Sequence, residues 1–181
     1  MKLTKSYQGG HFMQVNIPTE NNLLPDRYGK YADEADRYNG RPVVSFPFSI
    51  SDVPAGTKTL AIRFIDHDSI PVAGFTWIHW TAVNIDPSIT EFPADASRHH
   101  DFDMTQGKNS SAGHLVGETD PKSSQGYTGP TPPNSDHAYT LTVYALDTEL
   151  PLHEGYWLNE FYHASEGHII DSVSQDVISR K

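Results

Sequence analysis

The feature of this chain that most constrains its fold is a set of three strand-like runs, at residues 59–66, 75–85 and 137–146. In the first and third runs, apolar side chains recur at every second position, which is the period of a strand with one buried face. The second run is apolar on both faces, which indicates a strand in the centre of a sheet. Its period of two predicts one face made of Phe75, Trp77, His79, Thr81 and Val83. Strands therefore dominate, and the sequence predicts a mainly β protein.

The segments between these runs are rich in turn residues, with 13 Gly and 13 Pro in 181 residues. Residues 18–41 predict a long surface connection. Residues 42–50 predict a short strand, in which Pro47 argues for a sheet edge or a bulge. About 50 residues of polar loop, including the segment 98–126, separate the second and third runs, and loops this long are usually functional or disordered. Helical spacing of apolar residues predicts one short helix within residues 156–167.

Composition excludes several classes of protein. No cysteine is present, so a disulfide framework, a thiolate zinc site and a cysteine nucleophile are excluded. The formal charge of −10 argues against nucleic acid and anionic membranes as partners, because both are polyanions. The sequence has no apolar run of the ~18–20 residues that span a bilayer, and residues 1–10 carry no apolar signal-peptide core. We therefore expect a cytoplasmic protein, without membrane insertion, that folds as one domain over residues 1–181.

Polar groups mark the ends of the three strand-like runs. Two carboxylates follow the first run, an imidazole flanked by tryptophans lies in the second, and an imidazole and a phenol open the third after two prolines. These residues are Asp66, Asp68, Trp77, His79, Trp80, Pro132, Pro133, His137 and Tyr139. If the three strands are neighbours, these side chains converge on one pocket.

The residue types in such a pocket suit two kinds of chemistry. Imidazoles and a tyrosine hydroxyl donate hydrogen bonds to a phosphate or a carboxylate, and nearby carboxylates orient the imidazoles or accept from an ammonium group. This pattern favours a small anionic or zwitterionic ligand. Two histidines and one or two aspartates also suit zinc or iron, so a metal-dependent hydrolase is the alternative. A third hypothesis is a docking inhibitor of an enzyme that uses the loop 107–133 as its contact surface.

Simpler explanations exist for several of these residues. An Asp after a strand is a common turn signal, and a histidine beside a tryptophan is often a satisfied core residue. The segment His99-His100-Asp101 is typical of a solvated loop. Ser135-Asp136-His137 contains the residue types of a hydrolase triad, but triad members come from separate elements and the chain has no Gly-x-Ser-x-Gly elbow. We therefore predict no catalytic residue.

Four motifs follow one another along the chain. They are Asp66-His67-Asp68-Ser69-Ile70-Pro71; Trp77-Ile78-His79-Trp80 with Val83-Asn84-Ile85; Gly126-Tyr127-Thr128-Gly129-Pro130-Thr131-Pro132-Pro133; and His137-Ala138-Tyr139 leading into Val143-Tyr144-Ala145-Leu146. Each motif alone is weak, but the four in this order are specific. From about residue 42 to residue 167, the chain resembles the phosphatidylethanolamine-binding proteins, specifically their bacterial Raf-kinase-inhibitor-like branch.

This resemblance implies an antiparallel Greek-key β-sandwich with a few short peripheral helices. It also implies a small anion pocket at one end, formed by Asp66, Asp68, Trp77, His79, Pro132, Pro133, His137 and Tyr139. Members of the family bind phosphorylated head groups, some inhibit kinases or serine proteases by docking, and catalysis is not their established role. The resemblance therefore implies a non-enzymatic binding protein without cofactor or metal. A protein partner and a homodimer are further expectations.

The chain departs from the family pattern at several positions. His67 replaces the first proline of the Asp-Pro-Asp loop, and Ile70 stands where a second proline is usual. Ala138 replaces an arginine, and Ser135 replaces a common glycine. The loop over residues 108–125 is also longer than usual. These differences bear on the ligand more than on the fold or the place of the pocket.

Overall fold

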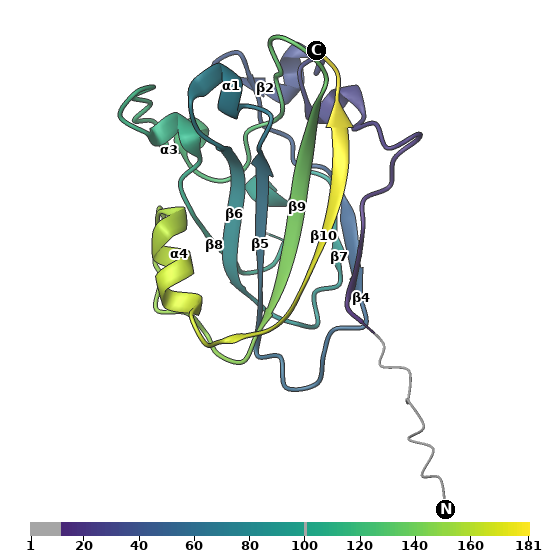
Figure 1. The fold of residues 1–181 in the computed structure, drawn as a ribbon, viewed down its shortest axis with the longest axis vertical. Coiled ribbons are helices and arrows are strands. Elements are labelled where there is room, and N and C mark those ends of the chain that lie inside the picture. The colour runs from purple at the N-terminus through teal and green to yellow at the C-terminus, as the bar shows by residue number, and fades with distance from the viewer. Residues whose placement is uncertain (1–11, 100) are drawn as a thin grey trace, which may run out of the picture.

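Two antiparallel sheets pack face to face in the computed structural model, which describes residues 12–99 and 101–181 (Figure 1). The larger sheet has the strand order β10-β9-β5-β6-β8. Its strands are β5 (Thr59–Asp66), β6 (Trp77–Ile85), β8 (Thr105–Gln106), β9 (His137–Leu146) and β10 (Ile169–Ser179). The smaller sheet has the order β1-β4-β7, from β1 (Gln14–Asn16), β4 (Phe48–Ser51) and β7 (Glu91–Phe92). A short hairpin joins β2 (Arg37–Tyr38) to β3 (Arg41–Pro42).

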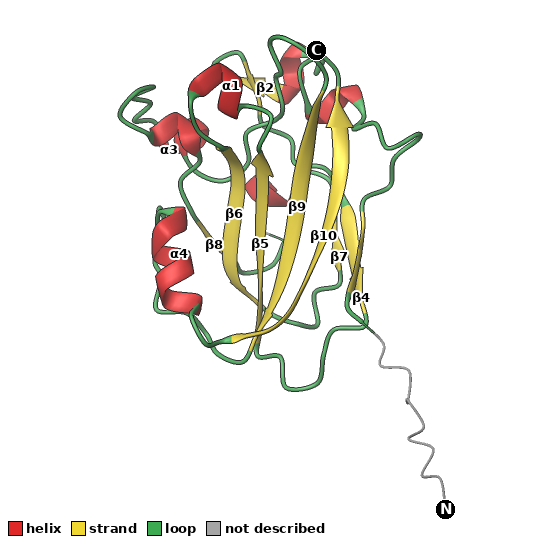
Figure 2. Ribbon diagram, in the orientation of Figure 1, coloured by secondary structure: helices red, strands yellow, loops and turns green. Residues whose placement is uncertain are grey.

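The helices are short and lie at the periphery of the sheets (Figure 2). They are α1 (Ile70–Ala73), α2 (Ala96–His99), α3 (Pro121–Ser124), α4 (Leu158–Ser165) and the single 3₁₀ turns η1 (Asp26–Tyr28), η2 (Glu34–Asp36) and η3 (Ser110–Ala112). In the larger sheet, β9 returns after β5, β6 and β8 to pair with β5, which is the strand order of a Greek key. The predicted fold, an antiparallel Greek-key sandwich with few short helices, is confirmed.

Large aromatic side chains fill the space between the two sheets. They are Phe46, Phe48, Phe64, Trp80, Phe92, Tyr127 and Tyr139. The rings of Phe48 in β4 and Phe92 in β7 stack with centroids 4.1 Å apart, which joins these two strands of the smaller sheet. Each such ring removes a large apolar area from water, so this core fixes how the two sheets pack.

Helix α4 covers the opposite face of the larger sheet beside β6 and β8 (Figure 1). Phe161 of α4 packs against Tyr144 of β9, with ring centroids 5.2 Å apart. The carboxylate of Glu160 accepts the backbone N–H of Trp157, which caps the first turn. Gly167, at a φ of 80°, follows the helix and turns the chain into β10. The helix predicted within residues 156–167 is therefore present, shortened at both ends.

Several sequence predictions need correction. The strand predicted over residues 42–50 splits into β3 and β4, and β4 lies in the middle of the smaller sheet rather than at an edge. The predicted 50-residue loop contains β7, α2, β8, η3 and α3. Strand β10 was not predicted at all.

An irregularity in β6 changes which of its side chains face the core. Phe64 pairs with Trp80 and Ile65 pairs with Ile78, so His79 is an extra residue in the ladder. A β-bulge of this kind directs two successive side chains to one side of the sheet. Beyond the bulge, Val83 packs in the cluster under α4 while Trp80 packs in the main core. The prediction that Thr81 and Val83 share a face with His79 is therefore wrong.

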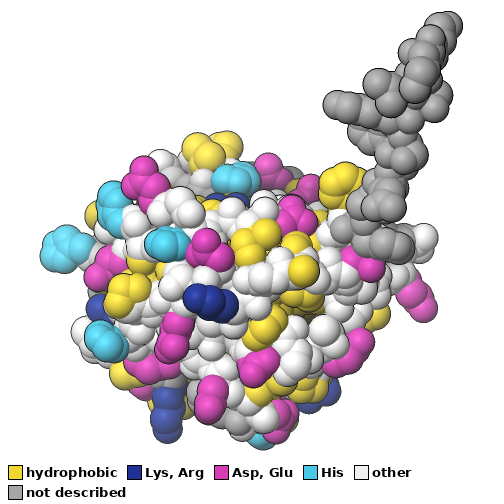
Figure 3. Space-filling model, turned by 90° about the horizontal axis from the view of Figure 1, so that it is seen from below, with side chains coloured by type: hydrophobic (Ala, Val, Ile, Leu, Met, Phe, Trp, Pro, Cys, Tyr) yellow, Lys and Arg dark blue, Asp and Glu magenta, His cyan; other side chains and the backbone are white. Residues whose placement is uncertain are grey.

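No helix of the described residues is long and apolar enough to cross a membrane. At the end of the molecule away from α1, Asp and Glu side chains are spread over the surface and Lys and Arg are few (Figure 3). This distribution agrees with the formal charge of −10.

Candidate functional site

A pocket of about 280 Å³ lies at the end of the larger sheet where β5 ends and β6 and β9 begin. Helix α1, the β2–β3 turn and the segment 128–133 complete its walls. Seven of the eight predicted site residues line it: Asp66, Trp77, His79, Pro132, Pro133, His137 and Tyr139. Antiparallel pairing explains this convergence, because Asp66 lies opposite Trp77 on one side and Tyr139 on the other.

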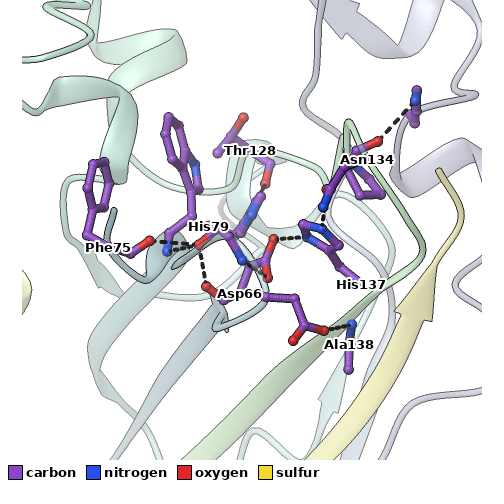
Figure 4. Close-up of polar contacts among 12 residues, drawn as sticks. Asp66, Phe75, His79, Thr128, Asn134, His137 and Ala138 are labelled. Carbon is purple, nitrogen blue, oxygen red and sulfur yellow. Dashed lines mark hydrogen bonds and ion pairs between the residues drawn. The ribbon is translucent and has the colours of Figure 1, made fainter. Parts of the chain in front are cut away.

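A buried pair of Asp66 and His137 forms one wall (Figure 4). Oδ2 of Asp66 lies 2.8 Å from Nδ1 of His137, and both side chains are at most 4% exposed. The other carboxylate oxygen accepts the backbone N–H of Ser69 at 3.0 Å. On the far side of the imidazole, Nε2 lies 2.8 Å from Oδ1 of Asn134. Both nitrogens of His137 therefore have partners within the protein.

His79 has only one of its two ring nitrogens engaged. Nδ1 donates to the backbone carbonyl of Thr128 at 2.7 Å, so this nitrogen carries a hydrogen. Burial lowers the pKa of His79 to about 4, outweighing the Thr128 carbonyl and the charge of Asp66, which favour the protonated ring. At neutral pH the ring is therefore uncharged, and Nε2 carries a lone pair.

The free nitrogen of His79 is open to the pocket. Among the described residues, the fully buried side-chain polar atoms without a hydrogen-bond partner are Arg63 Nε, Thr81 Oγ1 and Tyr156 Oη. Nε2 of His79 has no hydrogen-bond partner within the described chain and is not one of these atoms, so it retains accessible surface where His79 lines the pocket. The pocket thus presents a hydrogen-bond acceptor at this point.

Tyr139 contributes a neutral phenol to the pocket. Burial raises its pKa, and so does the charge of Asp66. The ring packs edge-on against His79, with centroids 5.1 Å apart. The sequence predicted that His79, His137 and Tyr139 would donate to a ligand; in the structure, Nδ1 of His79 and Nδ1 of His137 bond to groups of the protein.

The other walls are apolar. Trp77 is half-buried and stacks on Phe75 with ring centroids 5.8 Å apart. Val72 and Ala73 of α1 and the prolines of the 128–133 segment face the same space. Apolar walls exclude water and strengthen the few polar contacts that a ligand makes.

Asp68 is the predicted site residue that does not line the pocket. Its side chain is exposed, and Oδ2 accepts the backbone N–H of Ala138 at 2.8 Å, which holds the start of β9. His67 is also exposed and lies 3.0 Å from the hydroxyl of Thr76. Ile70 is 48% exposed on α1. These departures from the family pattern alter the surface beside the pocket rather than its lining.

Sequence reasoning missed several residues of the site. Among the described residues that line the pocket, Arg41 is the only Lys or Arg, and its guanidinium donates to Ser111 Oγ at 2.9 Å. The Ser69 hydroxyl lies 2.7 Å from the backbone carbonyl of Asp66 and accepts the N–H of Trp77 at 2.9 Å. A signal for Arg41 was present, since it follows an Asn-Gly turn that reverses the chain.

No three His, Cys, Asp or Glu side chains of residues 12–99 and 101–181 are grouped so as to hold a metal ion together. Asp66 and His137 bond to each other, and Nδ1 of His79 bonds to the backbone carbonyl of Thr128. The residue types that suggested a metal site are therefore arranged as a pair and a separate imidazole.

Comparison with known proteins agrees with this architecture. A family model described as phosphatidylethanolamine-binding protein matches residues 10–177. The Bacillus subtilis protein YxkA is 53% identical over 167 residues, covering 92% of this chain and 99% of its own. A UPF0098 protein of Chlamydia muridarum is 34% identical over 130 residues, covering 70% of this chain and 76% of its own.

Two solved structures share the fold. The Chlamydia trachomatis protein CT736, described as a homolog of the phosphatidylethanolamine-binding proteins, superimposes with a TM-score of 0.71 at 27% identity, over 94% of this chain and 97% of that one. Escherichia coli YbcL superimposes with a TM-score of 0.72 over 96% of this chain and 99% of that one. At 22% identity, YbcL shows the fold alone.

Proposed function

Because the chain belongs to the phosphatidylethanolamine-binding protein family, we propose that it is a non-enzymatic binding protein whose pocket takes a small phosphate-like or phosphorylated head group. The observation that carries this proposal is the pocket itself. Its volume of about 280 Å³ lies at the lower limit of the roughly 300–1,000 Å³ of ordinary ligand sites. Apolar walls with a few convergent polar groups are typical of such sites.

The charges around the pocket favour a ligand with little net charge. The carboxylate of Asp66 bonds to His137, so neither side chain is free to pair with a charge on the ligand. His79 is uncharged at neutral pH, so Arg41 is the charged group left to balance an anion. A monoanion or a zwitterion such as O-phosphoethanolamine matches these charges better than a polyanion.

The polar groups of the site serve binding better than catalysis. The Ser69 hydroxyl is held between backbone groups and is not paired with a base. His137, the imidazole paired with a carboxylate, has Asn134 at its second nitrogen instead of a nucleophile. A nucleophile activated by a neighbouring base is the usual requirement for covalent catalysis.

Calorimetric titration with O-phosphoethanolamine, in metal-free buffer without phosphate and again with added zinc, tests the proposal. We expect saturable binding with a stoichiometry of about one in both buffers, since the polar groups described above need no metal. Binding only in the presence of zinc would contradict the proposal and would indicate a metal-dependent site. No heat in either buffer would overturn the proposed function.

Substitution of Arg41 by glutamine should weaken O-phosphoethanolamine binding about tenfold, because a hydrogen bond to a charged group contributes roughly 1.5–3 kcal/mol. The same titration on the variant measures this loss. Arg27→Gln is the matched control: Arg27 pairs with Asp36 on the surface and lies outside the pocket lining. Equal affinity of the Arg41 variant and the wild type would remove Arg41 from the site.

A further inference from the structure

The hydrogen-bonding state of His79 restricts which anions the pocket can accept. Nδ1 already donates to the carbonyl of Thr128, and a carbonyl oxygen cannot donate in return. The nitrogen that faces the ligand is therefore an acceptor whenever the ring is neutral. An oxyanion without a proton places its own lone pairs against that nitrogen, so the two groups repel each other.

No neighbouring group of the described residues relieves this mismatch. The titratable groups beside His79 are Asp66 on β5 and His137 and Tyr139 on β9, and Arg41 on β3 lines the same pocket. Nδ1 of His137 bonds to Asp66, and Nε2 of His79 has no hydrogen-bond partner among the described residues. The proton between His79 and an anion must therefore arrive with the ligand or from solvent.

We infer, on the basis of the proposed function, that this pocket selects oxyanions that retain an ionisable proton, namely hydrogen phosphate and phosphomonoesters, over sulfate and phosphodiesters. A phosphomonoester monoanion carries one P–OH group, which can donate to Nε2 of His79 while its other oxygens accept from Arg41. Sulfate and phosphodiesters have no such proton near neutral pH. Leaving a buried polar group unpaired is the general means by which sites reject close analogues.

This inference predicts a specific pH dependence. The second ionisation of a phosphomonoester lies at a pKa of about 6. Above that pH the dominant dianion must gain one proton to bind, so affinity should fall about tenfold for each further pH unit. Proton uptake should then approach one per ligand bound, whichever of the ligand and His79 finally holds the proton.

The test is calorimetry of the full chain at about pH 6, 7 and 8, in pairs of buffers with different ionisation enthalpies at fixed ionic strength. The ligands are inorganic phosphate, O-phosphoethanolamine, sulfate and glycerophosphoethanolamine, a soluble phosphodiester. At about pH 7 we expect inorganic phosphate and the monoester to bind at least tenfold more tightly than sulfate and the diester. At about pH 8 we expect proton uptake when O-phosphoethanolamine binds, because its dianion has lost the P–OH group; inorganic phosphate, whose dianion still carries one P–OH group, should bind without it.

His79→Gln should reduce this selectivity to a ratio near one and remove the proton uptake, because an amide can present either a donor or an acceptor. His67→Gln, an exposed histidine outside the pocket lining, is the matched control and should behave like the wild type. Tight binding of all four ligands without proton uptake would overturn the inference and leave the proposed function intact. Proton uptake that persists in a folded His79→Gln protein would also overturn it, and failure of every ligand to bind would overturn both.

If the His79 variant does not fold, the wild-type protein still decides the question. The ratio of phosphate to sulfate affinity and the number of protons taken up need no substitution. Glycerophosphoethanolamine carries an ammonium group that can donate to Nε2. If glycerophosphoethanolamine binds as tightly as O-phosphoethanolamine, the hydrogen bond to Nε2 of His79 comes from the ammonium group. That result would contradict the selection of protonated oxyanions.

Discussion

Replacing Asp66 by alanine should lower the free energy of unfolding by about 2–6 kcal/mol, because two buried hydrogen-bond donors lose their acceptor and each unpaired buried donor costs roughly 1–3 kcal/mol. The carboxylate accepts from His137 and from the N–H of Ser69, and these groups are buried. Its loss leaves the backbone N–H of Ser69 and Nδ1 of His137 on β9 without an acceptor. Urea denaturation followed by tryptophan fluorescence measures the change.

Asp68→Ala is the matched control for this substitution. It removes the same chemical group two residues away, but Asp68 is exposed and holds a single backbone N–H of β9. We expect a loss of stability several-fold smaller than that of the Asp66 variant. Equal losses from the two variants would contradict the structural role assigned to the buried pair.

Replacing Trp80 by alanine should also cost about 3–5 kcal/mol of folding free energy, as large aromatic-to-alanine changes in a core do. Trp80 is fully buried between the sheets, and its indole N–H donates to Gln106 Oε1 at 2.8 Å. The substitution leaves a cavity and removes one partner of a buried amide. Urea denaturation measures this loss, and a loss below about 1 kcal/mol would contradict the placement of Trp80 in the core.

Trp77→Ala distinguishes the role of Trp77 from that of Trp80, which lies in the same motif. Trp77 is half-buried and lines the pocket, so its loss should reduce ligand affinity more than stability. Titration with O-phosphoethanolamine measures the affinity of this variant, and urea denaturation measures its free energy of unfolding. A variant that unfolds as readily as Trp80→Ala and binds as tightly as the wild type would reverse the two roles.

The sequence was sufficient to predict a set of residues that line the pocket, with one exception. The strands from Thr59, Trp77 and His137 are long and mostly apolar, so their pattern identified them and their ends located the polar groups. The resemblance of the ordered motifs then indicated the fold and eight pocket residues. Seven of these eight residues line the pocket in the structure. The prediction that Asp68 lines the pocket was wrong, because the alternation of side chains along β5 does not continue into the turn that follows it.

The chemistry of the site was not predictable in the same way. The bulge at His79 and the bond from its Nδ1 to the Thr128 carbonyl depend on the backbone of another segment, which no side-chain pattern reports. Asn134 and Arg41 reach the site only through the fold. In the binding mode that we propose, these contacts change the role of His79 from a donor to the ligand into an acceptor from it.

Strand β10 was missed for a different reason. Ser172, Ser174 and Asp176 face outward, while Asp171 and Gln175 occupy alternate half-buried positions, so polar residues appear on both faces. An edge strand with polar residues on both faces gives almost no periodic signal, although it pairs with β9 along nearly its whole length. Pairing with a strongly apolar neighbour, rather than its own propensity, makes this segment a strand.

The buried pair also determines which variants can test binding. His137→Ala leaves the carboxylate of Asp66 buried without its main partner, so loss of binding in that variant would reflect damage to the fold as much as loss of a contact. His79 has a single backbone partner and is the cleaner position for substitution.

The state of the His79 ring in the free and ligand-saturated protein tests the central claim most directly. Long-range ¹H–¹⁵N spectra of the imidazoles distinguish a protonated from an unprotonated ring nitrogen. We predict that at about pH 7 the free protein shows His79 with hydrogen on Nδ1 only, and that saturation with inorganic phosphate shifts the Nε2 resonance toward that of a hydrogen-bonded or protonated nitrogen. An Nε2 that already carries hydrogen in the free protein, or one that phosphate leaves unchanged, would contradict the account.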